Sequence, residues 1–234
     1  MSRRMRMMIG GGLVLLLAAG AVILLTGDDD KDKLPPPTTT TQPSTTTTTA
    51  APALDTSTAV WPVASSSTRY ADPVDAARGF AIDFVGMPNP VLSAFRQGDS
   101  RSGEVDVQPF ADGPITTVLV RQLADDTWWV LGATTANIQV TAPSALAVVS
   151  SPVSLAGTST AFEATVNVEI REDGNAQALG TGFVMGGGNG EFGPFQSTLT
   201  FTAATQDYGA LVFVTVSPED GGILEAAVVR IAFA

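Results

Sequence analysis

The sequence predicts a mostly β protein with an N-terminal transmembrane helix, a small α+β domain and a C-terminal β-sandwich. Three observations support this fold class. Residues 7–26 carry no charge, a helical pattern followed by alternating strands fills residues 61–142, and turn signals divide residues 143–234 into short strand-like runs. No convincing helical pattern occurs after residue 143, which favours a sandwich there.

The N-terminus is expected to cross a membrane once. Residues 1–6 form a short cytoplasmic tail with Arg3, Arg4 and Arg6, and residues 7–26 form the apolar helix. About 20 helical residues span roughly 30 Å, the thickness of the hydrocarbon core. The positive-inside rule keeps the arginines in the cytoplasm, so the C-terminal domains are predicted to be extracytoplasmic on a single-pass protein of the cell membrane.

Two alternatives stay open for this segment. A cleaved signal peptide would use the small residues Ala18 to Ala21, but the apolar run continues to Leu25, whereas a cleavage site normally ends the apolar region. A helix buried in a soluble domain is the other alternative. A lipoprotein anchor is excluded because the chain has no cysteine to acylate.

Residues 27–60 are predicted to be a disordered linker rich in threonine and proline. Pro35, Pro36 and Pro37 precede long threonine runs, and such a composition cannot bury a core. At roughly 3 Å per residue in an extended form, the linker would hold a domain tens of Å from the bilayer. It is either an O-glycosylated stalk through a cell-wall layer or a plain tether.

The pattern of residues 61–142 predicts a small α+β domain. A helix begins at Asp72 as N-cap with Pro73 in its first turn, and apolar residues through Phe84 share one face. A second short helix is expected from Val91 to Phe95. Strands are expected at residues 104–110, 115–123, 127–133 and 137–140. One helix followed by an antiparallel meander is typical of an α+β fold.

About seven short strands are expected in residues 143–234. They lie at residues 145–149, 153–157, 162–171, 178–185, 195–202, 210–216 and 224–233. In the third, apolar residues from Phe162 to Ile170 alternate with polar residues, as a half-buried antiparallel strand requires. The spacing of the turn signals is typical of a β-sandwich.

Composition removes several classes of function. The chain has 234 residues with no cysteine and no histidine, so serine-histidine triads, thiolate nucleophiles and zinc sites built on these residues are excluded. The net charge is −11, and seven arginines face nineteen acidic residues after Lys33. This field repels phosphate backbones, so no nucleic-acid partner is expected. Carboxylate chemistry and hard-cation binding remain open.

A family resemblance adds to this reading of the C-terminal part. Gly157 after a strand, Phe162-Glu163 at the start of a long strand, and Gly193-Pro194-Phe195 before a late strand resemble the immunoglobulin-like domain of bacterial spore germination proteins. The resemblance covers about residues 145–234 and implies an immunoglobulin-like β-sandwich. It implies no catalytic residue. Residues 61–142 do not clearly resemble the domain that precedes it in the germination proteins.

Two acidic turns are candidates for a metal site. Glu172 and Asp173 lie in one turn, and Glu219 and Asp220 lie in another. If the two turns converge at one end of the sandwich, their carboxylates could bind calcium, which takes six to eight oxygen ligands. The same acids could in principle hydrolyse a glycosidic bond, but short turns rarely form the cleft that this reaction needs. The simpler interpretation is that these are plain hairpin turns with no cofactor.

Two further candidates lie in the α+β domain. Arg101, in the glycine- and serine-containing loop of residues 98–104, could bind a carboxylate or phosphate, or the loop is a helix C-cap with Gly98 left-handed. Trp128 and Trp129 point to opposite faces of a strand, so one of them could be an exposed platform for a sugar or a partner. The alternative is that both are covered, by the helix on one face and by the second domain on the other. The glycines of residues 186–190 are not a phosphate-binding loop, because no Lys-Ser/Thr pair or helix follows.

These features predict a non-catalytic binding or adhesion module of the bacterial cell envelope. The expected partners are a cell-wall polymer or an envelope protein, with the membrane reached through the N-terminal helix. The alternative is a small-molecule sensor with a pocket in the α+β domain. An enclosed cavity with Arg101 or a tryptophan at its mouth would favour the sensor. An exposed aromatic or apolar patch would favour adhesion.

Overall fold

The computed structural model describes residues 54–234, and backbone contacts group residues 50–234 into one compact unit. The expected cytoplasmic tail, transmembrane helix and most of the linker lie outside the described residues. No helix within residues 54–234 is long and apolar enough to cross a membrane.

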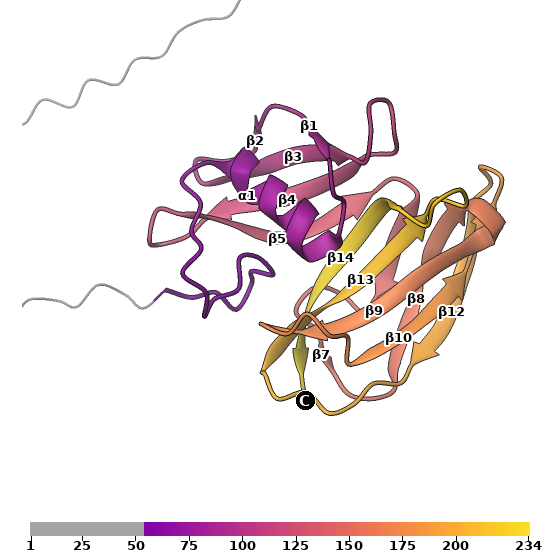
Figure 1. The fold of residues 1–234 in the computed structure, drawn as a ribbon. Coiled ribbons are helices and arrows are strands. Elements are labelled where there is room, and N and C mark those ends of the chain that lie inside the picture. Colours follow the sequence, from indigo (N-terminus) through magenta and orange to yellow (C-terminus); the bar gives the residue numbers. More distant parts are fainter. Residues whose placement is uncertain (1–53) are drawn as a thin grey trace, which may run out of the picture. The chain divides into compact units, whose positions relative to one another are not determined.

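The described chain is mostly β (Figure 1). Its helical elements are α1 (Pro73–Gly79), the π-helical segment η1 (Phe80–Val85) and the 3-10 turn η2 (Phe162–Ala164). Its strands are β1 (Val91–Leu92), β2 (Arg96–Gln97), β3 (Ser102–Gln108), β4 (Thr116–Gln122), β5 (Trp128–Thr135), β6 (Ile138–Ala142), β7 (Val148–Val149), β8 (Val153–Ala161), β9 (Thr165–Glu172), β10 (Gly180–Met185), β11 (Gly187–Gly188), β12 (Gly193–Leu199), β13 (Tyr208–Val216) and β14 (Ile223–Phe233).

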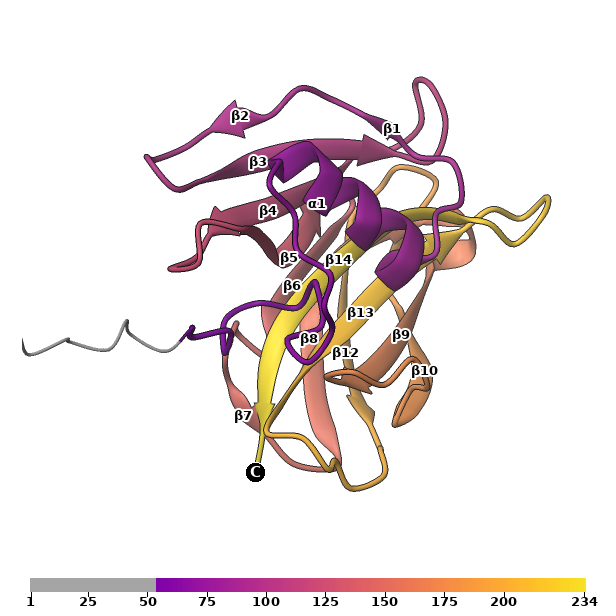
Figure 2. The same cartoon turned by 60° about the vertical axis from the view of Figure 1, so that its left-hand side comes forward.

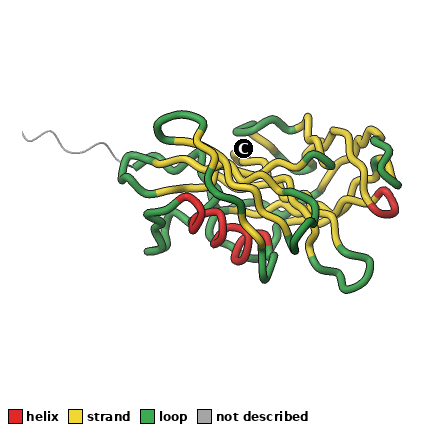
Figure 3. Tube along the Cα trace, turned by 90° about the horizontal axis from the view of Figure 1, so that it is seen from above, coloured by secondary structure: helices red, strands yellow, loops and turns green. Residues whose placement is uncertain are grey.

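The predicted helix at Asp72 is confirmed. The Asp72 side chain accepts hydrogen bonds from the backbone N–H groups of Val74 (2.7 Å) and Asp75 (3.2 Å), which satisfies two of the free donors at a helix start. The helical segment ends at Gly86, whose φ of 96° is a conformation that glycine adopts without strain. Seen from the sides and from above, the helix lies across one face of the sheet (Figures 2 and 3).

The predicted second helix at residues 91–95 is wrong. Val91 and Leu92 instead pair with the edge of β3, and the Ser93 N–H donates to the Asp106 carbonyl at 2.9 Å. A helix of five residues gains too few internal hydrogen bonds to compete with such pairing. β3, β4 and β5 follow as the expected antiparallel meander.

The C-terminal part contains the expected short strands. β8 pairs with β6 and β12 in one layer, while β10, β9, β13 and β14 follow one another in a second layer. The strand predicted from Phe162 begins only at Thr165, because Glu163 and Ala164 adopt left-handed backbone angles (φ 53° and 58°) in η2. The strand expected at residues 145–149 is reduced to β7, because Leu146, which precedes it, adopts a left-handed φ of 62°.

The two predicted domains share one continuous sheet. Its strand order is β1-β3-β4-β5-β14-β13-β9-β10, so β14 connects the meander to the sandwich (Figure 1). Residues on one face of β13 and β14, among them Val212 and Val228, pack into a core beneath α1 and η1. Phe213 and Ile231, on the opposite face, pack into a second core between the sandwich layers. Both strands are therefore buried on two faces.

Residues 54–60, assigned to the linker from the sequence, belong partly to the folded unit. β5 and β14 meet at only one residue pair, Ala133 with Val228, and then diverge. The N-terminal segment fills the gap: the Val60 N–H donates to the Val130 carbonyl at 2.8 Å, and Arg230 Nε donates to the Ser57 carbonyl at 2.8 Å. Val60 is buried, so the linker boundary predicted at residue 60 is too late.

Candidate functional site

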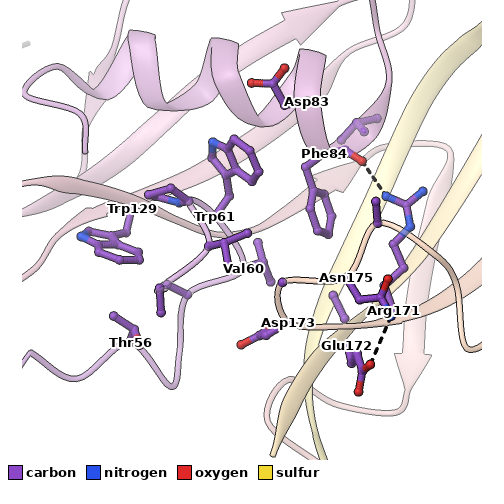
Figure 4. A pocket seen from close by; sticks show the side chains of 18 of the residues that line it. Thr56, Val60, Trp61, Asp83, Phe84, Trp129, Arg171, Glu172, Asp173 and Asn175 are labelled. Carbon is purple, nitrogen blue, oxygen red and sulfur yellow. Dashed lines mark hydrogen bonds between the residues drawn. The ribbon is translucent and has the colours of Figure 1, made fainter. Parts of the chain in front are cut away.

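A pocket of about 350 Å³ lies where the N-terminal segment meets the helix-side core and the turn after β9 (Figure 4). Its walls come from residues 56–64, from residues 83–86 at the end of η1, and from residues 171–176 after β9, together with Trp129 and Ala210. We call it the junction pocket. It brings one predicted tryptophan, Trp129, close to one predicted acidic turn.

Aromatic side chains form one wall of the junction pocket. The Trp61 and Phe84 rings lie 6.4 Å apart, and Trp61 Nε1 donates to the Tyr70 hydroxyl at 3.3 Å. Trp129 is fully buried: Arg69 lies over its ring at 4.8 Å, and its Nε1 donates to Thr127 Oγ1 at 2.9 Å. These contacts fix the wall in place and leave the indole N–H groups occupied.

Trp128 and Trp129 point to opposite faces of β5, as expected, but neither is an exposed platform. Trp128 packs against the helix-side core, and its ring meets the Phe95 ring edge-on at 5.2 Å. Trp129 is covered on the other face. Both rings therefore contribute to packing, which agrees with the alternative in which both faces of the strand are covered and not with an exposed platform.

Glu172 closes one end of the sandwich core. It follows Val166, Val168 and Ile170 on the core-facing side of β9 and is itself buried. Its Oε2 accepts from the backbone N–H of Thr205 at 2.6 Å and of Gln206 at 3.2 Å, and its Oε1 accepts from Asn175 Nδ2 at 3.2 Å. The Thr205 backbone hydrogen bond is the main cause that lowers the pKa of Glu172. The charged carboxylate holds the loop before β13.

Asp173 neutralises a buried arginine. Its two oxygens accept from Arg230 at 2.5 and 2.7 Å, and Arg230 is 3% exposed. Arg230 also lies over the Tyr208 ring at 5.1 Å and contacts the Ser57 carbonyl. A guanidinium loses its hydration when it is buried, and a bidentate pair with a carboxylate compensates for that loss. The first acidic turn therefore holds the fold together.

The second acidic turn lies at the opposite end of the sandwich. β9 and β13 are antiparallel, and Glu172 pairs with Gly209 at the start of β13. Glu219 and Asp220 follow the end of β13, where Asp220 accepts from the Gly222 N–H at 3.0 Å. The expected convergence of the two turns on calcium is therefore wrong. Among residues 54–234, no group of three or more acidic side chains is placed to hold a metal ion.

Arg101 is engaged inside the meander. Its Nε donates to the Gln122 carbonyl at 3.1 Å, and its terminal nitrogen donates to the Leu123 carbonyl and to Asp126 at 3.0 Å. The guanidinium thus closes the turn between β4 and β5 and is not free for an anion. The alternative helix C-cap is also wrong, because Gly98 follows β2 and has no left-handed φ.

A larger hollow, about 830 Å³, opens at the end of the sandwich that holds η2 and the β13–β14 turn. We call it the end hollow. Glu225 lies against it, is 4% exposed, and accepts from Asn137 Nδ2 at 3.2 Å, from Thr215 at 3.2 Å and from Thr135. Glu225 closes this end of the core much as Glu172 closes the other.

Other polar groups at the end hollow have no partner within the described residues. The side chains of Asn167, Asn189 and Glu163 line the hollow and make no hydrogen bond or ion pair within residues 54–234. Phe162 lines it too, with 59% of its surface exposed. Sequence reasoning missed this site. The sequence does carry one signal of this site. Glu225 is the first of only two charged residues, with Arg230, in the otherwise apolar strand β14.

Comparison with known families assigns the C-terminal part. Residues 137–222 match the family described as the immunoglobulin-like domain of bacterial spore germination. The match begins with β6, which pairs with β8, and it ends in the β13–β14 turn. It confirms the resemblance seen in the sequence and leaves the helix and the meander outside. No curated protein and no solved structure matches the chain.

Proposed function

We propose that this chain is a non-catalytic binding module of a bacterial cell envelope, anchored in the membrane by residues 7–26. The matched family supports a module related to spore germination. The uncharged N-terminal stretch and the Thr/Pro-rich segment after it support an anchor and a stalk. The partner is a cell-wall polymer or an envelope protein.

One observation carries the binding role. Four large apolar side chains that border one end and edge of the sandwich are more than half exposed: Phe162, Phe183, Met185 and Phe192. Single exposed apolar residues are ordinary on a protein surface, but a group of them indicates an interaction site. Strand pairing brings their backbones together, because Met185 pairs with Thr165 and Gly187 pairs with Thr160.

The position of this group suits a stalked module. The chain enters the folded unit beside Arg230, near the C-terminal end of β14, whereas the end hollow lies beside Glu225 near its start. These two points of β14 are separated by about 17 Å along the strand. The end hollow, with Phe162 at its lining, therefore lies at the end of the sandwich opposite the point at which the linker joins.

The contacts of the acidic residues support a non-catalytic role. Glycoside hydrolysis by two carboxylates needs one acid with a raised pKa beside a carboxylate that is free to act. Glu172 has a lowered pKa and is held by the Thr205 loop, and Asp173 is bound to Arg230. Neither acid is arranged for acid–base catalysis.

The junction pocket favours a second candidate, the small-molecule sensor. Its volume of about 350 Å³ and its aromatic wall of Trp61, Phe84 and Trp129 are typical of a small-ligand site. Three of its charged groups, in contrast, are already bound to other protein groups: Glu172, Asp173 and Arg171. A ligand screen read by thermal shift, with Phe84→Ala as the test variant, distinguishes this candidate from adhesion.

Sedimentation with purified cell walls tests the proposed function. We expect a fragment of residues 50–234 to bind saturably, and equally well with calcium and with chelator, because the acidic turns do not converge. Loss of binding with chelator would contradict the prediction that binding needs no metal ion. Absence of binding under both conditions, while the fragment stays folded, would shift the assignment to an envelope protein or to the junction pocket.

A further inference from the structure

We propose that the end hollow binds a glycan segment that carries no anionic groups, with Phe162 stacking on a sugar ring and the amides of Asn167 and Asn189 bound to its hydroxyls. This inference rests on the proposed function and names the ligand class and the site.

The first step is that the hollow has unused hydrogen-bonding capacity. A carboxamide offers two donors and an acceptor, a set that can pair with the hydroxyls of a sugar. Asn167 and Asn189 line the hollow, and within residues 54–234 their side-chain amides have no partner. In the junction pocket, by comparison, Glu172, Asp173 and Arg171 are bound to protein groups, although among the described residues Asp83 is not.

The second step is the aromatic rim. Phe162 is 59% exposed and is the first residue of η2, the turn in which Glu163 and Ala164 are left-handed. Such conformations cost free energy in residues other than glycine and gather at functional sites. The exposed Phe162 ring lines the same hollow as the unpartnered amides. A small number of polar groups next to an apolar surface is the usual composition of a ligand site.

The third step is charge. Glu225 and Glu163 are carboxylates at the hollow, and none of the described residues that line it is basic. Negative potential at such a concave surface disfavours phosphate- or carboxylate-rich polymers. Glu225 already accepts hydrogen bonds at both oxygens, so it does not bind the ligand directly. It contributes negative potential to the hollow and positions the side chain of Asn137. The hollow therefore selects a neutral glycan over an anionic polymer.

The test uses the residue 50–234 fragment and two probes: a soluble oligosaccharide of neutral N-acetylated sugars, and poly(glycerol phosphate). We expect saturable binding to the glycan and none to the phosphate polymer. Phe162→Ala should weaken glycan binding roughly three- to tenfold, and Asn167→Ala by a similar factor, whereas Phe162→Tyr retains it. The matched controls Phe110→Ala and Asn89→Ala change exposed residues that do not line the hollow.

The outcomes distinguish a failure of this inference from a failure of the proposed function. If the wild type binds whole walls and Phe162→Ala and Asn167→Ala bind them equally well, the site is wrong and the binding function stands. If the phosphate polymer binds as tightly as the glycan, the ligand class is wrong. If the folded wild type fails to bind whole walls, this inference fails, and the partner is an envelope protein or the ligand belongs in the junction pocket.

Discussion

Asp173 and Glu172 are neighbours in the chain, yet they stabilise different contacts. Asp173 offsets the charge of Arg230, which fixes the N-terminal segment through Ser57. Glu172 instead accepts backbone N–H groups of the 205–206 loop. Because buried charges are costly unless they are paired or hydrogen-bonded, each acid is tied to one neighbour. A turn that could have been a metal site is thus structural.

Replacing Glu172 with Gln is expected to make stability less dependent on pH. The folded pKa of Glu172 is lowered, so its contribution is fully present above the unfolded value of about 4.3 and is lost as pH falls through the folded value. At pH 7 the variant should lose about 1–2 kcal/mol of unfolding free energy, from charged hydrogen bonds. Urea unfolding at pH 7 and at pH 3 measures the difference.

The control for that experiment is Glu191→Gln, at an exposed position. It should change unfolding little at either pH. A Glu172→Gln variant that loses as much stability at pH 3 as at pH 7 would show that the carboxylate charge is not what holds the loop.

Asp173→Asn is expected to destabilise the protein by about 3 kcal/mol, because it leaves the buried Arg230 charge without its partner. Thermal melting at neutral pH measures this loss. Asp126→Asn is a suitable control, since Asp126 pairs with Arg101 at the exposed surface. Equal melting temperatures for Asp173→Asn and the wild type would contradict the assigned role.

At the scale of elements, local sequence pattern predicts a strand or helix where one face of the element is exposed to solvent and the other packs into a core. The alternation in β9 and the N-cap at Asp72 were sufficient to predict those elements. The alternation fails in β13, where seven consecutive residues are buried, because both faces of this strand are covered. Nor does local pattern show that β14 bridges to β5, since that contact joins Val228 to Ala133, far apart in sequence.

The N-terminal segment is expected to act as an element of the fold although its composition resembles the linker. A fragment that starts at residue 61 loses Ser57, Ala59 and Val60, and with them a carbonyl that Arg230 needs and two buried side chains. It should therefore melt several degrees below a fragment that starts at residue 54. Equal melting temperatures would show that the segment does not close the gap between β5 and β14.

At the scale of the whole molecule, the two cores cannot be separated without breaking β13 and β14. Phe80 belongs to the helix-side core and Phe195 to the sandwich core, and both cores contact these two strands. Phe80→Ala and Phe195→Ala should each cost about 3–5 kcal/mol and lower one common unfolding transition. Calorimetry that resolves two transitions, with only one shifted by each variant, would contradict a shared core.

The end hollow shows why the site was harder to predict than the fold. Phe162-Glu163 was visible in the sequence, but it was interpreted as the start of a strand. Asn137 comes from the turn before β6, Asn167 from β9 and Glu225 from β14, and these elements meet only after the sheets are assembled. The predicted metal site at the two acidic turns is wrong for the same reason. Strand direction places the two turns at opposite ends of the sandwich, and local sequence pattern does not give strand direction.

The central claim is that binding occurs at the end of the sandwich away from the linker. Hydrogen exchange of the residue 50–234 fragment, measured with and without solubilised wall glycan, tests it most directly. The account predicts slower amide exchange at residues 160–167, 187–191 and 215–225. Slower exchange confined to residues 56–64, 83–86 and 171–176 would contradict it and would place the ligand in the junction pocket.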